Sequence, residues 1–253
     1  MKLLEVCVDS LASARAAIRG GADRLELCSA LIAGGLTPYV HLLEQIRRES
    51  KIPIRCLMRP RPGDFLYTPE EIDLMVRQIP VLKAAGADGF VIGCLTPQGL
   101  VDTAAMKPLV DAADGAALTL HRCFDVCLSY ADAILACNDL GIDTILTSGG
   151  AASCLKGMDD LGEILELKEV FNGPEILVGA GVNAAAIRTI RNRFPALESF
   201  HMSGKVEIES KMEFRVEGVP MGLPGLDEWH IQQTDEQAVR DAVTALHAPI
   251  CKN

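Results

Sequence analysis

One short pattern occurs three times in this 253-residue chain, and it marks the passage from a helix to a strand. In each copy a glycine is followed by Ala or Ile, an aspartate, one further residue and an apolar run: GGADRLELC (20–28), AGADGFVIG (85–93) and LGIDTILTS (140–148). A stretch rich in Ala and Leu precedes each copy, and glycine readily ends a helix with positive φ. The run that follows is too short for a helix and rich in Leu, Ile and Val, as in a strand covered on both faces.

Five further apolar runs bring the number of expected strands to eight: 3–8, 53–58, 116–121, 175–179 and 197–203. Amphipathic stretches fill the intervals, at about 10–20, 38–50, 69–86, 103–113, 128–141, 158–171 and 183–193. Eight alternating units in about 250 residues predict an α/β fold of one domain, a closed (β/α)8 TIM barrel spanning 1–253. An open doubly wound sheet is the alternative. The barrel is favoured because the repeats are evenly spaced and no glycine-rich nucleotide turn follows the first strand.

The C-terminal part departs from this alternation. Residues 205–233 are rich in Gly and Pro and are expected to be irregular, wrapping the barrel mouth or an interface, before a last helix near 235–247.

Composition narrows the classes of partner. The net charge is −10 and aromatic residues make up 4% of the chain, which argues against nucleic-acid binding. No apolar stretch is long enough to span a membrane, and Glu5 and Asp9 interrupt the N-terminal apolar run, so neither a membrane protein nor a secretory signal is expected. Nine scattered cysteines are typical of reduced thiols, which predicts a cytoplasmic location.

In a barrel of this kind the chemistry gathers at the C-terminal ends of the strands. Two glutamates, Glu5 and Glu26, each precede a cysteine by two residues, so Glu and Cys share a face of each strand. Buried carboxylates need partners, and the same rim supplies arginines and two histidines. Either the glutamates are structural ions in a polar layer, or they line a ligand site.

Cys7 and Cys28 come from adjacent strands, so their sulfurs are expected to lie close together. Two thiolates would suit Cu(I), while the alternative is that both cysteines are small apolar core residues. His121, Cys123 and Cys127 in HRCFDVC match no standard zinc spacing.

A different set of residues suggests an enzyme. Glu26 and His121 could form an acid/base pair, with Asp125 orienting His121, while Arg59 and Arg61 hold an anion or stabilise developing charge. Two glycine-rich turns could take a phosphate on their main-chain N–H groups, or could simply keep the turns compact. Their candidate residues are Ser148, Gly149, Gly150, Gly179 and Gly181.

Several motifs occur in order along the chain: EVCVDS…SA (5–14), GGADRLELCSAL…GGLTP (20–38), RPRPGDFLY (59–67), HRCFD (121–125), LTSGG (146–150), GAGVN (179–183), HMSGK (201–205) and MEFR (212–215). They resemble the copper homeostasis protein CutC family. The resemblance that they carry runs from about residue 3 to 247, nearly the whole chain. The resemblance implies a cytoplasmic TIM barrel, usually a homo-oligomer such as a dimer or tetramer, with Cu(I) ligands that fall on Cys7 and Cys28. Cys123 departs from the family, which more often has alanine there.

Three hypotheses follow. The first is Cu(I) binding in copper homeostasis, with no organic cofactor. The second is a barrel enzyme acting on a small anionic or phosphorylated metabolite by Glu/His acid–base chemistry. The third is a non-catalytic assembly protein whose segment 205–233 forms the subunit interface.

Overall fold

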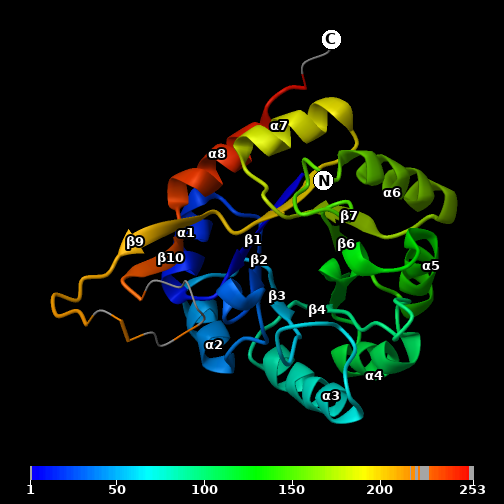
Figure 1. Cartoon of the computed structure of the whole chain (residues 1–253), viewed down its shortest axis with the longest axis horizontal. Coiled ribbons are helices and arrows are strands. Elements are labelled where there is room, and N and C mark those ends of the chain that lie inside the picture. Colours follow the sequence, from blue (N-terminus) through cyan, green and yellow to red (C-terminus); the bar gives the residue numbers. More distant parts are fainter. Residues whose placement is uncertain (1, 217, 220–221, 223–227, 251–253) are drawn as a thin grey trace.

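Parallel strands β1 to β8 close into a barrel in the computed structural model, which describes residues 2–216, 218–219, 222 and 228–250 (Figure 1). The strands pair in sequence order, and β8 pairs with β1 to close the ring. The TIM-barrel prediction is therefore confirmed. The strands are β1 (Leu3–Val8), β2 (Arg24–Leu27), β3 (Ile54–Leu57), β4 (Gly89–Ile92), β5 (Ala117–Leu120), β6 (Thr144–Thr147), β7 (Glu175–Val178) and β8 (Ser199–Met202).

Helices follow the strands and surround the barrel (Figure 1). Each begins within two residues of its expected start. They are α1 (Leu11–Gly20), α2 (Val40–Glu49), α3 (Pro69–Ala84), α4 (Thr103–Ala113), α5 (Tyr130–Leu140), α6 (Met158–Phe171), α7 (Ala184–Arg193) and α8 (Glu236–His247). In the part of the chain that the structure describes, no helix combines the length and apolar character needed to cross a bilayer.

The threefold repeat has a structural role for its aspartate as well as its glycine. The glycines, Gly21, Gly86 and Gly141, all have positive φ just after a helix, as expected. Each aspartate then bonds the strand before that helix: the carboxylates of Asp23, Asp88 and Asp143 accept from the main-chain N–H groups of Leu4, Ile54 and Leu118. The main-chain N–H of each aspartate in turn donates to the carbonyl of the strand residue that its carboxylate binds. The repeat thus fastens β1 to β2, β3 to β4 and β5 to β6.

Charged side chains inside the barrel are paired within it. Arg55 on β3 bonds Asp143 (2.8 Å) and Thr144 (3.0 Å), and also reaches Thr119 on β5. Glu5 on β1 bonds Arg24 on β2. These bonds satisfy Glu5, Arg24 and Arg55, which are buried, whereas the side chain of Asp143 is 46% exposed.

The segment after β8 differs from the expectation of an irregular wrap. Its two ends pair as an antiparallel ribbon, β9 (Lys205–Glu209) with β10 (His230–Thr234), which projects from the barrel next to α1 (Figure 1). Each of these two strands is only five residues long, which is too short for an alternation of apolar and polar residues to predict a strand clearly. Residues 217, 220–221 and 223–227 of this segment lie outside the described residues.

Candidate functional site

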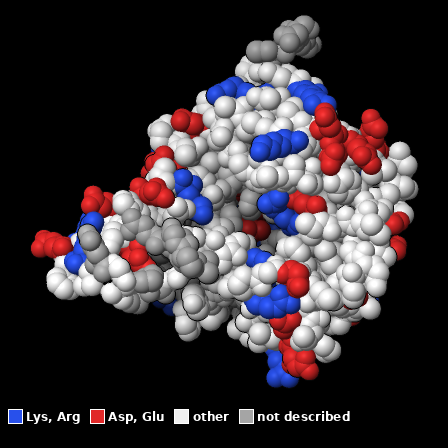
Figure 2. Space-filling view, viewed as in Figure 1, with Lys and Arg blue, Asp and Glu red and all other residues white. Residues whose placement is uncertain are grey.

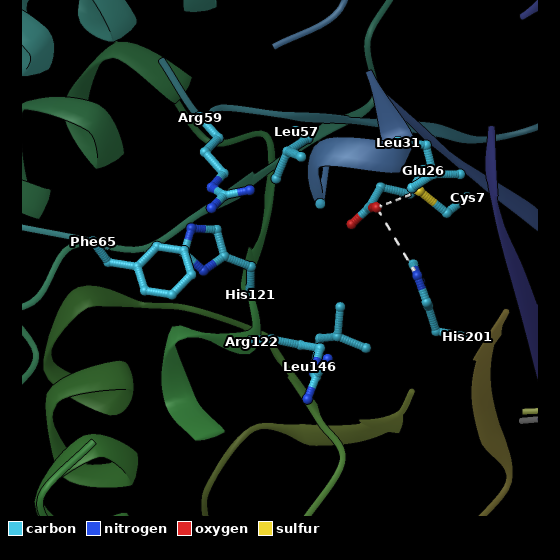
Figure 3. Close-up of a pocket in the computed structure, with 11 residues that line it drawn as sticks. Cys7, Glu26, Leu31, Leu57, Arg59, Phe65, His121, Arg122, Leu146 and His201 are labelled. Atoms are coloured by element: carbon cyan, nitrogen blue, oxygen red, sulfur yellow. Dashed lines mark hydrogen bonds and ion pairs between the residues drawn. The ribbon is translucent and has the colours of Figure 1, made fainter. Parts of the chain in front are cut away.

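A pocket of about 270 Å³ opens at the barrel end where the strands finish. Figure 2 shows a hollow near the middle of this face, with basic and acidic side chains at its edge. Most of its polar side chains come from the last residues of strands or the first residues after them, as expected for a barrel. The lining residues are Cys7, Glu26, Leu31, Gly34, Leu57, Arg59, Phe65, His121, Arg122, Leu146 and His201 (Figure 3).

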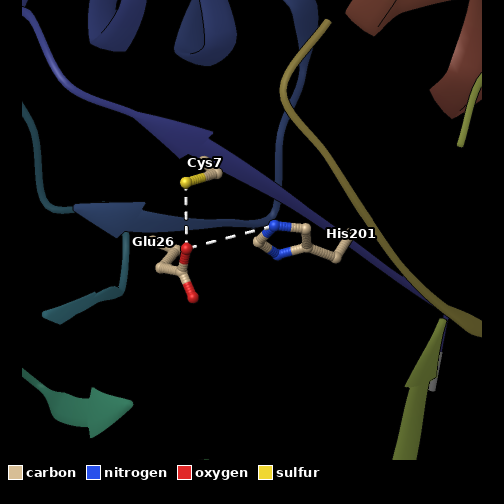
Figure 4. Close-up of side chains that lie close together, drawn as sticks. All are labelled: Cys7, Glu26 and His201. Carbon is tan, nitrogen blue, oxygen red and sulfur yellow. Dashed lines mark hydrogen bonds and ion pairs between the residues drawn. The ribbon is translucent and has the colours of Figure 1, made fainter. Parts of the chain in front are cut away.

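Three of these side chains converge on one side of the pocket. Cys7 on β1, Glu26 on β2 and His201 on β8 place their ligand atoms within 4.8 Å of one another (Figure 4). The Cys7 thiol donates to Glu26 Oε2 at 2.9 Å, and His201 Nε2 lies 4.0 Å from the same oxygen. Among the described residues this is the group of Cys, His and acidic side chains whose geometry could hold a metal ion.

Glu5 sets the direction of the histidine. Its Oε1 pairs with His201 Nδ1 at 2.8 Å and its Oε2 with Arg24 Nε at 2.5 Å. A carboxylate on one imidazole nitrogen fixes the ring and leaves the other nitrogen as a ligand, an arrangement common around protein-bound metals. Here the free nitrogen, Nε2, faces Glu26 and Cys7 (Figure 4). Glu5 therefore positions the ring of His201 relative to Cys7 and Glu26.

Burial and pairing shift the pKa values of these groups. Burial would raise the pKa of Glu5, but the bonds from His201 and Arg24 outweigh it and hold the value at about 2. Burial likewise opposes the charged form of His201, yet the carboxylates of Glu26 and Glu5 leave its pKa raised. Burial, with the nearby charge of Glu5, raises the pKa of Glu26.

The two cysteines of the repeated Glu-x-Cys pattern are neighbours, as adjacent strands predict. Cys7 Sγ and Cys28 Sγ lie 3.6 Å apart, and the Cys28 thiol also contacts the carbonyl of Val8. Cys28 does not itself line the pocket but packs behind Cys7 with Leu57 and Val91. The contact with Cys28, burial and the charge of Glu26 together raise the pKa of Cys7 well above its usual range.

The predicted pairing of Asp125 with His121 is wrong. His121 Nδ1 accepts from the main-chain N–H of Cys123 at 3.1 Å. Burial and the nearby charge of Arg59 lower the pKa of His121 to about 3. His121 also lies across the pocket from Glu26, whose partners are Cys7 and His201, so the two do not form the expected pair (Figure 3).

Asp125 instead fills the first glycine-rich turn. Its carboxylate accepts from the main-chain N–H groups of Ser148 (3.0 Å) and Gly150 (3.2 Å) and from the hydroxyls of Thr147 and Ser148. The turn does bind an anion, as its main-chain N–H groups predict, but the chain supplies that anion. Gly149 completes the turn, with its N–H donated to Thr147 Oγ1.

The second glycine-rich turn, with Gly179 and Gly181, does not line the pocket. The side chain of Asn183 accepts from the N–H groups of Ala185 and Ala186, which caps the start of α7. The N-terminus of this helix is therefore already satisfied.

The two arginines of RPRPGDF separate. Arg59 lines the pocket and donates to the carbonyls of Gly35 (3.1 Å) and Gly63 (2.9 Å). Arg61 lies outside the pocket, where it bonds Asp64 and Glu71 and holds its own loop together.

His201 is one of the two histidines that the sequence places at the rim, but sequence reasoning gave it no metal or catalytic role. Only closure of the barrel brings β8 beside β1 and pairs His201 with Glu5 in register. A signal did exist, because a histidine near the end of the eighth strand must face the same mouth as Cys7.

Comparison with known proteins assigns the family. The model of the CutC family matches residues 2–206. The chain belongs to the CutC family. CutC family proteins of Bacteroides fragilis (38% identical) and Vibrio campbellii (39% identical) align over 96% of this chain and over 97% and 98% of their own lengths.

A crystal structure from Streptococcus agalactiae, described as a candidate copper homeostasis protein CutC, is similar with a TM-score of 0.74 and 27% identity. It covers 80% of this chain and 99% of its own. A 2,3-dimethylmalate lyase with a TM-score of 0.54 and 18% identity, covering 80% of this chain and 75% of its own, shares the fold alone.

Proposed function

We propose that this CutC-family chain acts in copper homeostasis in the cytoplasm and binds one Cu(I) ion at the Cys7 side of the pocket. The observation that carries the proposal is the 3.6 Å separation of the Cys7 and Cys28 sulfurs, with His201 and Glu26 beside them. Soft thiolate ligands select Cu(I) among the common metals. The description of the S. agalactiae relative points the same way.

The sulfur separation bears on the number of ligands. Two sulfurs on opposite sides of one ion, at metal–sulfur bonds of about 2.3 Å, would lie about 4.6 Å apart. The observed 3.6 Å is shorter than this, so Cys7 and Cys28 would hold the ion together with a further ligand rather than alone. His201 Nε2 would be this ligand once it has lost its proton, and Glu5 holds the ring toward this position.

Metal binding must displace the thiol protons, since the thiolate is the ligand. The raised pKa of Cys7 means that the metal-free protein holds this proton at neutral pH. Glu26 accepts the hydrogen bond of that thiol and its own pKa is raised, so it is placed to take the proton.

The test is an anaerobic competition titration against a Cu(I) chelator, on the wild type and on Cys7→Ser/Cys28→Ser. We expect one tight site per chain, lost in the double variant, with the fold retained by circular dichroism. Cys137→Ser is the matched control, because Cys137 is a buried thiol on α5 that does not line the pocket. Binding that survives in the double variant would refute the site, and tighter binding of Zn²⁺ than of Cu(I) would refute the choice of metal.

A second candidate function is that of a barrel enzyme acting on a small anionic metabolite. It is favoured by Glu26, a carboxyl group with a raised pKa inside a walled pocket. A raised pKa lets such a group hold and deliver a proton at higher pH than an ordinary carboxyl group, with His201 rather than His121 as its partner. If wild type converts any member of a panel of organic acids and phosphate esters followed by NMR, Glu26→Gln should lose that turnover, and unchanged turnover would refute the role of Glu26.

A further inference from the structure

The pocket has two unlike sides (Figure 3). Cys7, Glu26 and His201 form one side, and copper binding uses only that side. Across the pocket lie His121 and Arg59 with Phe65 beside them, and Arg122 lines the wall between. On this second side, the described residues leave one polar group without a hydrogen-bond acceptor and one charged group without a counter-ion.

His121 carries a donor without an acceptor. The residue is 4% exposed, and Nε2 has no hydrogen-bond partner among the described residues. Because Nδ1 accepts from the N–H of Cys123, the neutral ring carries its proton on Nε2. A buried donor without an acceptor costs free energy that a ligand oxygen can restore.

Arg59 adds a charge without a counter-ion. Its residue exposure is 8%, and the bonds of its guanidinium within the described chain go to main-chain carbonyls, with no acidic side chain paired to it. These carbonyls accept only from the terminal nitrogens, Nη1 and Nη2, and the buried Nε has no hydrogen-bond partner among the described residues. The carbonyl dipoles also leave the positive charge uncompensated. Arg122, also in the lining, adds a second guanidinium although Asp125 pairs with it.

The rest of this side is apolar. Leu57, Phe65 and Leu146 line it, and the Phe65 ring lies against both His121 (4.7 Å between ring centroids) and Arg59 (5.2 Å from its guanidinium carbon). A volume of about 270 Å³ is at the small end of the range for ligand pockets. Positive charge, one free donor and apolar walls suit a small anion with a short carbon body.

A carboxylate fits better than a phosphate. Phosphate sites in barrels rely on main-chain N–H groups of glycine-rich turns. Here Asp125 occupies the 148–150 turn, and the 179–181 turn does not line the pocket. What remains is a set of side-chain donors for one or two oxygens.

We propose that the second side of the pocket binds the carboxylate of a small organic acid, between His121 Nε2 and the guanidinium groups of Arg59 and Arg122. The acid's carbon body would lie on Leu57, Phe65 and Leu146. This site gives a ligand class to the second candidate function, but it stands without copper binding and without a catalysed reaction.

The test is ligand-observed NMR and calorimetry on the metal-free wild-type protein with acetate, lactate, succinate and inorganic phosphate as probes. We expect saturable 1:1 binding of at least one carboxylate and weaker binding of phosphate. His121→Phe keeps a ring against Phe65 but removes the donor, and should weaken carboxylate binding about tenfold or more. His41→Phe is the matched control, since His41 is exposed on α2, and should change nothing.

Arg59→Lys provides a second variant. The substitution is conservative because Arg59 holds a loop that a larger change could disrupt. Lys keeps the positive charge, so Arg59→Lys should weaken carboxylate binding less than His121→Phe. Cys7→Ser/Cys28→Ser should retain carboxylate binding within about twofold, which separates this site from the copper site. No saturable binding of any carboxylate, equal binding in His121→Phe, or preference for phosphate would each overturn the proposal.

Discussion

At the scale of the residue, the histidines of the pocket have opposite electrostatic surroundings. His121 lies beside a guanidinium and is neutral, whereas His201 lies between two carboxylates and its pKa is raised. The residue type is the same in both cases, and the charged groups that distinguish them lie far away in the sequence: Arg59 is 62 positions from His121, and Glu5 is 196 positions from His201. Their chemical roles therefore had to come from the structure.

His121 should make the protein sensitive to acid. Unfolded histidine takes up its proton near pH 6.5, but folded His121 does so only at about 3, so stability is full above 6.5 and falls as pH drops from 6.5 toward 3. The loss reaches at most about 5 kcal/mol. Chemical denaturation across this range should show a flatter dependence in His121→Phe than in wild type. The same slope in both proteins would contradict the shift, and His41→Phe should match wild type.

Glu5 should matter for both stability and metal affinity. Glu5→Gln leaves Arg24 buried without its counter-ion and weakens the hold on His201. We expect a loss of about 3 kcal/mol in the free energy of unfolding and about 10- to 100-fold in Cu(I) affinity. Denaturation and chelator competition measure the two effects.

Glu49 offers the matched control for Glu5, because it also pairs with an arginine, Arg15, but at the surface. Glu49→Gln should lower the free energy of unfolding far less than Glu5→Gln, because exposed ion pairs contribute little to stability. Equal effects of the two substitutions would show that burial of the Glu5 pair is unimportant.

At the scale of the element, the strand-to-helix turns show what a local pattern can and cannot establish. The Gly-x-Asp repeat predicted helix ends and strand starts because those depend on residues close in sequence. The TSGG turn was a candidate phosphate site, but its main-chain N–H groups bind the carboxylate of Asp125, which lies more than twenty residues earlier. Nothing local could have distinguished an internal carboxylate from an external ligand.

Asp125 is expected to be a major stabiliser of this region. Its side chain is 5% exposed and accepts from Thr147, Ser148 and Gly150, so Asp125→Ala leaves several buried donors unpaired. We expect a loss of about 3 kcal/mol in unfolding free energy. Asp139→Ala, an exposed change on α5, should stay within about 0.5 kcal/mol of wild type. A mild effect of Asp125→Ala would mean that water replaces the carboxylate.

At the scale of the whole molecule, closure of the barrel creates the site. Cys7 and Cys28 could be paired from the sequence because consecutive strands are neighbours. Joining His201 to them required β8 to meet β1, which is a property of the complete ring. The same limit applied to the ribbon, whose strands are joined by a long intervening segment.

Homo-oligomer formation remains a prediction, and the ribbon is where it can be tested. Val206, Ile208 and Ile231 on β9 and β10 are 43%, 39% and 55% exposed, although such side chains usually lie inside. Light scattering should give a dimer or tetramer for wild type and a smaller species for Ile208→Lys/Ile231→Lys. Lys substitution of exposed Val170 on α6 is the control. A monomeric wild type would contradict the prediction.

The aspartates of the repeat also divide the barrel into pieces. Asp23, Asp88 and Asp143 each tie a strand to the next one at the N-terminal end of the pair, and Ser199 bonds Glu175 at the matching place in β7 and β8. The connections through α2, α4 and α6 lie between these fastened pairs, while those through α1, α3, α5 and α7 lie within them. A circularly permuted chain whose new ends lie in the α2, α4 or α6 connection keeps every fastened pair of strands covalently joined. Such a chain should refold into the closed barrel more readily than one whose new ends lie in the α1, α3, α5 or α7 connection.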